Sequence, residues 1–314
     1  MARHHDLPAS PATCHWGVFA ADLPPVLKIA SGDTVTVHCV SGAKETLPGP
    51  PFEILPEHPQ ILDQVKMGPG GHILTGPIHV EGAEPGDTLE VRIKDVALRQ
   101  DWGWTVIAPL KGTLPEDFPV RRIWHLPINR KAMTAEMPWG MKVPLKPFCG
   151  VMGVAPPAVY GRLSTIEPRE YGGNLDNKEL GTGSTLYLPV FNKGALFSTG
   201  DGHAVQGDGE VSITALETAV SGTFELIVRK DLKLRFPRAE TPTHFISMGL
   251  NVDLDEAAKQ ALREMITMIC EKLNVSREEA YMLCSLQVDL RVTQLVDGNK
   301  GIHAMLAKSL LAGR

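Results

Sequence analysis

The segment AEPGDTLEVRIKDVAL, residues 83–98, decides the fold class of this chain. After a Pro-Gly-Asp turn, apolar Leu89, Val91 and Ile93 alternate with charged residues, which is typical of a β-strand with one buried face. A second Gly-Asp-Thr turn, at residues 32–34, precedes another alternating run. Glycine (30 residues) and proline (25 residues) are also frequent, which indicates many turns. The first two thirds of the chain therefore predict many short β-strands.

The stretch between residues 98 and 158 is rich in proline, tryptophan and glycine. Proline removes a backbone donor, so this density argues against long helices and central strands. We predict ordered loops and edge strands here, some of which close over a site.

The pattern changes to a helical period after Asp253. Apolar residues recur at helical spacing over 254–273, and Asp253 is a suitable N-cap. Ser276 and Glu279 form the pattern of a capping box for a second helix. Residues 288–298 alternate again and are expected to rejoin a sheet. The layout is a large β unit with two helices late in the chain.

Composition excludes several classes of protein. A hydrophobic fraction of 43% and a charged fraction of 21% are those of an ordinary globular protein, and the net charge of −5 with no basic cluster argues against nucleic acid and membrane partners. No run of eighteen apolar residues occurs, and the N-terminus lacks the apolar core of a signal peptide. Five cysteines without CxxC spacing suit reduced thiols, so we expect a cytoplasmic location.

A glycine-rich acidic segment, GDGHAVQGDGE at residues 200–210, contains the most concentrated set of ligand-type side chains. Asp201 and His203 share one face of an extended segment, and Asp208 and Glu210 share a face after the turn. A hairpin would direct all four groups toward one point. Their spacing alone leaves three interpretations open: a solvated turn, a metal site or another catalytic site.

Other candidate residues have ordinary structural explanations beside functional ones. Asn174 and Asp176 suit an Asx-turn, and His79 and Glu81 share a face if their segment is a strand. Cys149 is either a thiol nucleophile or a buried structural cysteine, and the second interpretation is favoured.

Several blocks together resemble the acetamidase/formamidase family. They are TGPIHVEGAEPGDTLEV (75–91), GGNLDNKELGTGSTLYLPVFNKGALFSTGDGHAVQGDGEV (172–211), YMLCSLQVDLRVTQLVDGNKGIHAMLAKSLL (281–311) and FCGVMGVAP (148–156). The resemblance runs from about His15 to Leu310, in the order of the family.

The resemblance implies hydrolysis of formamide or acetamide to carboxylate and ammonia, a divalent metal site and a homo-oligomer. It implies a mainly β fold, a CUB-like or jelly-roll-type β-sandwich with the two late helices, α+β overall. The whole chain, 1–314, would be one domain, with a β-rich part at 10–250, a helical segment at about 253–287 and a tail at 288–314.

Seven positions match the family motif, namely Glu81, Asn174, Asp176, Asp201, His203, Asp208 and Glu210. We expect Asp176, Asp201 and His203 to bind the metal, and Glu210, Glu81 and Asp208 to supply catalytic carboxylates, with Glu210 or Glu81 as the general base for a metal-activated water. Because His203 is a nitrogen ligand, zinc is favoured over calcium.

Two alternatives to this mechanism remain open. One is a non-enzymatic β-sandwich binding module stabilised by a metal, and the other is a cysteine amidase that uses Cys149. Two further expectations concern packing. Residues 301–311, GIHAMLAKSLL, would be exposed in a monomer, which favours a homo-oligomer. The wall of an amide pocket is expected from Trp102, Trp104, Trp139 and Phe148.

Overall fold

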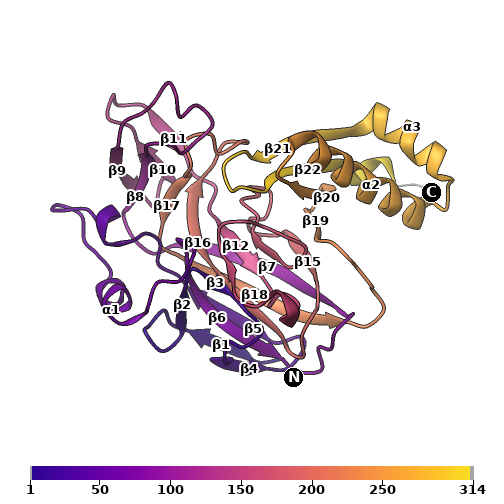
Figure 1. Cartoon of the computed structure of the whole chain (residues 1–314), viewed down its shortest axis with the longest axis horizontal. Helices are drawn as coiled ribbons and strands as arrows, with labels where there is room; N and C mark the ends of the chain where they lie inside the picture. The colour runs from indigo at the N-terminus through magenta and orange to yellow at the C-terminus, as the bar shows by residue number, and fades with distance from the viewer. Residues whose placement is uncertain (1, 312–314) are drawn as a thin grey trace.

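Two large β-sheets make up most of the computed structural model, which describes residues 2–311 (Figure 1). The nine-stranded sheet has the order β1 (His4–Leu7), β5 (Thr34–His38), β18 (Val220–Arg229), β7 (Thr88–Leu98), β15 (Thr185–Pro189), β19 (Arg238–Glu240), β20 (His244–Asn251), β22 (Lys300–Ala307) and β21 (Val288–Gln294). The second sheet has the order β11 (Lys142–Pro144), β10 (Thr134–Glu136), β9 (Arg122–Asn129), β8 (Trp102–Ile107), β17 (Leu216–Thr218), β16 (Ala195–Val205), β12 (Phe148–Gly153) and β14 (Gly172–Asn174). The strand β6 (Ile73–Val80) also pairs with β16 and with β2 (Cys14–Trp16) and β4 (Leu27–Ile29), and β3 (Val18–Phe19) pairs with β13 (Leu163–Ser164).

Apolar side chains from both large sheets form one shared core. Val91 and Leu226 of the first sheet belong to the same buried cluster as Leu74, Val151 and Phe197 of the second. Burying an aliphatic or aromatic side chain of this size stabilises the fold by about 1.5–3 kcal/mol. The prediction of a mainly β fold is confirmed, and the CUB-like or jelly-roll type of sandwich stays a prediction.

The alternation in β7 is confirmed on its apolar face. Leu89, Val91 and Ile93 are buried there. On the opposite face Glu90 is also buried, against the expectation of a solvated face, because Arg92 and Arg229 each bind its carboxylate at 2.6 Å.

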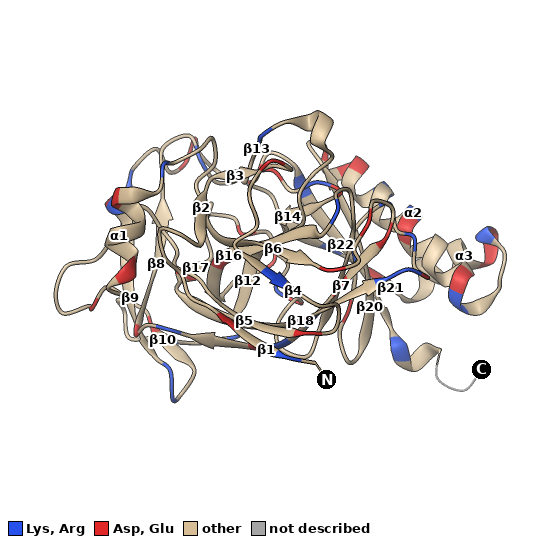
Figure 2. Ribbon diagram, turned by 90° about the horizontal axis from the view of Figure 1, so that it is seen from below, with Lys and Arg blue, Asp and Glu red and all other residues tan. Residues whose placement is uncertain are grey.

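The two late helices form as predicted. The helix α2 (Leu254–Leu273) begins at Asp253, whose carboxylate accepts the backbone N–H of Glu256, and α3 (Arg277–Gln287) begins with the complete capping box of Ser276 and Glu279. The apolar face of α2 packs with β20 and β22 in a second core, and both helices carry acidic and basic residues (Figure 2).

A third helix, α1 (Glu57–Gln64), was not predicted. Its N-cap is Pro56, which makes no side-chain cap, and Pro59 occupies its first turn, where the missing N–H would have no partner in any case. Both prolines are therefore compatible with this short helix.

Two expectations about buried segments were wrong. No central strand was expected between residues 98 and 158, but β12 is hydrogen-bonded on both sides, to β14 and β16. This is possible because residues 148–155, between Pro147 and Pro156, contain no proline. Residues 301–307 of the predicted exposed tail are the inner part of β22, between β20 and β21, so this stretch is covered within its own chain. Within residues 2–311, no helix has the length and apolar character needed to cross a membrane.

Candidate carboxylate and histidine site

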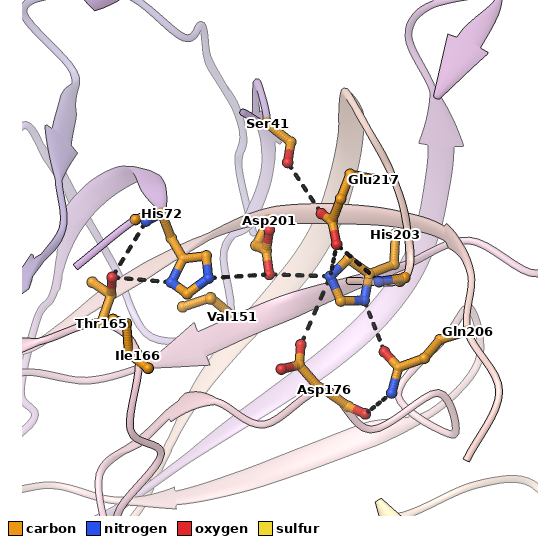
Figure 3. Close-up of polar contacts among 12 residues, drawn as sticks. Ser41, His72, Val151, Thr165, Ile166, Asp176, Asp201, His203, Gln206 and Glu217 are labelled. Atoms are coloured by element: carbon orange, nitrogen blue, oxygen red, sulfur yellow. Dashed lines mark hydrogen bonds and ion pairs between the residues drawn. The ribbon is translucent and has the colours of Figure 1, made fainter. Parts of the chain in front are cut away.

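Side chains from five segments meet at one end of β16, and Figure 3 shows those of Asp176, Asp201, His203 and Glu217. Asp201 and His203 lie on β16 itself, and Glu217 lies on β17. The remaining members of the cluster are buried residues of connecting segments. They are Asp176 after β14, Glu210 after β16 and Asp297 after β21.

Strand register explains why the cluster forms. His203 pairs directly with Glu217 across β16 and β17, so their side chains are neighbours on the same face. On the other side of β16, Cys149 and Val151 pair with Gly202 and Gly200, which places Gly150 opposite Asp201. A Cβ atom at Gly150 would lie 2.8 Å from Oδ2 of Asp201, so glycine is required here for the carboxylates to approach β12.

Three acidic members of the cluster have left-handed backbone conformations. The φ angles are 45° at Asp176, 55° at Asp201 and 44° at Glu210. Asp adopts this region more readily than most residues, whereas Glu210 is the less common case. Strained backbone of this kind is concentrated at functional sites, because the surrounding structure must hold it.

The imidazole of His203 is central to the cluster. Its Nε2 atom lies 3.1 Å from Oδ2 of Asp201, 3.2 Å from Oε1 of Glu217 and 3.8 Å from Oδ1 of Asp176 (Figure 3). On the far side of the ring, Nδ1 lies 2.9 Å from Oε1 of Gln206. Asp201 in turn lies 3.9 Å from Nε2 of His72.

Burial and mutual charge strongly perturb the pKa values of this cluster. Burial, together with the nearby charge of Asp201, raises the pKa of Glu217 to about 8. Burial and the neighbouring carboxylates likewise raise the pKa of Glu210 and of Asp297 well above the ordinary range. For His203, burial lowers the pKa, but the carboxylates of Glu217 and Asp201 outweigh it and the pKa is raised. Carboxylates packed this closely need a compensating positive charge.

Several buried oxygens at the site have no hydrogen-bond partner. They are Oδ1 of Asn174, Oδ1 of Asp176, Oε2 of Glu210 and Oδ2 of Asp297. Two sets of three ligand atoms within 4.8 Å of one another share His203, one with Asp176 and Glu210 and one with Asp201 and Glu217. Unpaired buried acceptors are costly, and a cation would satisfy them. The donor set of one imidazole with several carboxylates fits a divalent metal.

A cavity of about 300 Å³ opens onto the cluster. The unpartnered oxygens of Asn174, Asp176, Glu210 and Asp297 all belong to residues that line it. The cavity size is at the lower end of the range for small-molecule sites. Residues of other segments also line the cavity, among them Ser41, Gly42, His72, Ile73, Trp104 and Ile213.

Two of the predicted catalytic carboxylates lie apart from the cluster. Glu81 follows β6 and is half exposed, with its carboxylate 3.1 Å from Lys28. The register of β6 against β16 pairs Leu74 with Gly200 near the site and His79 with Ala195 at the other end, which separates Glu81 from Asp201 by roughly 20 Å along the strand. The pattern that would place His79 and Glu81 on one face therefore did not indicate that either residue lies near the site.

Asp208 is partly exposed and binds Lys178 at 3.0 Å. The expected hairpin does not form, because β16 ends at Val205 and the turn at Glu210 directs Asp208 and Glu210 to different surroundings. Glu210 therefore joins Asp176, Asp201 and His203, whereas Asp208 does not.

Three site residues were not found from the sequence: His72, Glu217 and Asp297. One feature of the sequence could have indicated Glu217, which is the single charged residue in the mostly apolar run ALETAV, residues 215–220. Of the four aromatic residues expected to form the wall, Trp104 alone lines the cavity. Trp102 is buried elsewhere, Trp139 is exposed, and Phe148 packs edge-on against His203.

Comparisons with known proteins match most of this chain. A model of the Acetamidase/Formamidase family matches residues 8–161 and 158–307. The formamidase of Methylophilus methylotrophus is 30% identical over 302 residues, which cover 76% of this chain and 72% of that protein. The crystal structure of the acetamidase from Bacillus halodurans has a TM-score of 0.85 at 32% identity and covers 97% of this chain and 98% of that one. The acetamidase from Yersinia enterocolitica has a TM-score of 0.87 at 28% identity, with 98% and 93% covered.

Proposed function

The chain belongs to the acetamidase/formamidase family of amidohydrolases, and we propose that it hydrolyses short linear amides such as formamide and acetamide. The family resemblance inferred from the sequence motifs is confirmed by the family match. The products would be a carboxylate and ammonia. The observation that carries the proposal is the set of unpartnered acidic oxygens of Asp176, Glu210 and Asp297 around one small cavity.

We further propose that Asp176, Asp201 and His203 hold a divalent metal ion, with zinc favoured over calcium because of the imidazole. Such an ion would supply positive charge that lowers the pKa of a coordinated water and polarises a carbonyl group. The unpartnered Oδ1 of Asp176 and the carboxylate oxygens that surround Nε2 of His203 support this assignment.

The hydrogen bonds of the two nearest glutamates suggest different roles. Both carboxylate oxygens of Glu217 are held, Oε1 by the backbone N–H of Ala215 at 3.1 Å and Oε2 by the hydroxyl of Ser41 at 3.2 Å. Glu217 therefore positions His203. Oε2 of Glu210 has no partner and borders the cavity. We assign Glu210 as the base that takes a proton from the attacking water and delivers it to the leaving nitrogen.

Kinetics with formamide and acetamide, combined with metal analysis of the purified protein, tests the proposal. Removal of the metal by a chelator should abolish turnover, and readdition should restore it. Glu210→Gln should lower kcat by at least about 100-fold while the metal content is unchanged, whereas His203→Ala should lower the metal content itself. Absence of activity on both amides would overturn the proposed function, and full activity without metal would overturn the metal assignment alone.

We also retain three broader proposals: a single β-sandwich domain, a cytoplasmic location and a homo-oligomer. The shared core of the two sheets supports the first, and five unpaired cysteines support the second. The homo-oligomer is now proposed on a different surface, because residues 301–307 are covered within the chain. Exposed apolar side chains gather on α3 and the edge strand β21, namely Tyr281, Met282, Leu286 and Leu290. A solution mass of 34.1 kDa by light scattering, that of one chain, would exclude an oligomer.

A further inference from the structure

The indole N–H of Trp104 is a buried donor without an acceptor at the edge of the cavity. Trp104 is 8% exposed, its Nε1 atom has no hydrogen-bond partner, and the residue lines the same cavity as the acidic cluster. A buried polar group without a partner costs about 1–3 kcal/mol, so such a group calls for an explanation.

Strand pairing directs Trp104 toward the cluster. The single paired position between β8 and β17 joins Trp104 to Glu217, so the two side chains stand next to each other on one face. Gly42 lies against the indole nitrogen, and a Cβ atom at this position would be 3.0 Å from Nε1. Its φ angle of +100° also favours glycine. Because Gly42 has no side chain, no Cβ atom fills the space beside this N–H.

The chemistry of the cavity identifies what this donor binds. An indole N–H only donates, so its partner must be an acceptor. With Asp176 and Asp201 assigned to the metal, the unpartnered carboxylate oxygen of Glu210 is the acceptor in this cavity that suits the NH₂ group of an amide. The acceptor that an amide offers is its carbonyl oxygen.

We propose that Trp104 binds the amide substrate through a hydrogen bond from Nε1–H to the carbonyl oxygen, an inference that rests on the proposed function. As water attacks the carbonyl carbon, the C=O π electrons move onto this oxygen, and the same N–H stabilises the developing negative charge. The substrate would then lie with its carbonyl oxygen toward Trp104 and its NH₂ group toward Glu210.

A second tryptophan on the same strand provides a matched control. Trp102 is buried as well, but its Nε1–H donates to the backbone carbonyl of Glu53 at 2.7 Å, and it does not line the cavity. Trp102→Phe removes a structural hydrogen bond, whereas Trp104→Phe removes a donor that the protein itself does not use.

Steady-state kinetics of the metal-loaded enzyme distinguishes the two variants. Trp104→Phe should reduce kcat/KM for formamide and acetamide by about 100-fold, mainly in kcat, with little loss of thermal stability. Trp102→Phe should lower the melting temperature and leave kcat/KM within about threefold of the wild type. A Trp104→Phe enzyme within about threefold of the wild type would overturn the proposal.

An NMR measurement on the wild-type protein tests the hydrogen bond without turnover. With ¹⁵N-labelled tryptophan, the indole signal that is missing in Trp104→Phe should shift when acetate is added, while the Trp102 signal should not. If the enzyme hydrolyses no amide, the proposed function fails, but this shift still decides whether Trp104 binds a carbonyl-type oxygen. An unshifted Trp104 signal at saturating acetate and acetamide would overturn the inference.

Discussion

Gln206 fixes the orientation of His203. Its amide nitrogen donates to the backbone carbonyl of Asp176 at 2.7 Å, so its amide oxygen must be the atom that faces Nδ1 of His203 at 2.9 Å. Nδ1 is therefore the protonated nitrogen, and in the neutral ring Nε2 presents its lone pair to Asp201 and Asp176. One buried amide thus determines which nitrogen is available to a metal.

The first prediction follows from this arrangement. Gln206→Leu removes the acceptor that holds the His203 ring, and loss of such a partner typically lowers metal affinity by about 10- to 100-fold. Competition with a zinc chelator measures the affinity, and thermal unfolding of the metal-free variant controls for misfolding. Unchanged affinity in a folded variant would show that Gln206 has no part in metal binding.

The second prediction concerns Cys149. This thiol is 2% exposed, and burial raises its pKa to about 11, so it carries almost no thiolate at neutral pH. Iodoacetamide should therefore modify the less buried Cys270 before Cys149 and leave amidase activity intact, as followed by mass spectrometry and kinetics. Loss of activity in proportion to alkylation of Cys149 would instead support a cysteine nucleophile.

Local features of the site and fold could be predicted from the sequence. Alternation along a strand placed Asp201 and His203 on one face, and their side chains lie 3.1 Å apart. The capping pattern of Ser276 and Glu279 depends on only four residues, and it forms as expected. In both cases the decisive geometry is fixed by neighbours in the chain.

Non-local features could not be predicted. Glu217 and Asp297 reach the cluster through strand pairing and a loop far along the chain, and alternation contains no information about which strands pair. Glu81 shows the opposite case, because it follows a strand, β6, that leads away from the site. Asp208 and Glu210 lie after the end of β16, and Glu210 has a left-handed φ of 44°, so the alternation of a regular hairpin does not apply to them.

The third prediction concerns stability in acid. His15 is buried, and desolvation lowers its pKa to about 4. The unfolded chain therefore binds a proton at this residue below about pH 6.5, whereas the folded protein does so only near pH 4. Unfolding free energy should fall by about 2–3 kcal/mol between pH 7 and pH 4.5 on this account.

Denaturant unfolding at several pH values measures this effect. His15→Gln should show a smaller loss of stability on acidification than the wild type, and the exposed His4 replaced by Gln should show the full loss. Equal pH dependence in the wild type and His15→Gln would show that His15 does not titrate as its burial indicates.

The last prediction concerns the size of the amide. The cavity of about 300 Å³ is bordered by Ile73, Trp104 and Ile213 as well as by the acidic cluster. Because the carboxylates fix the amide group at one end, each added methylene must fit against these side chains, at a cost of about 1–3 kcal/mol when it does not. We expect kcat/KM to fall from formamide or acetamide through propionamide to butyramide. Ile213 has a φ of 94°, so Ile213→Gly removes its side chain without adding backbone strain and should shift the preference toward the longer amides. Wild-type and variant kinetics on the four amides measure both effects, and a wild-type series that is flat or rises with chain length would show that these residues do not limit the substrate.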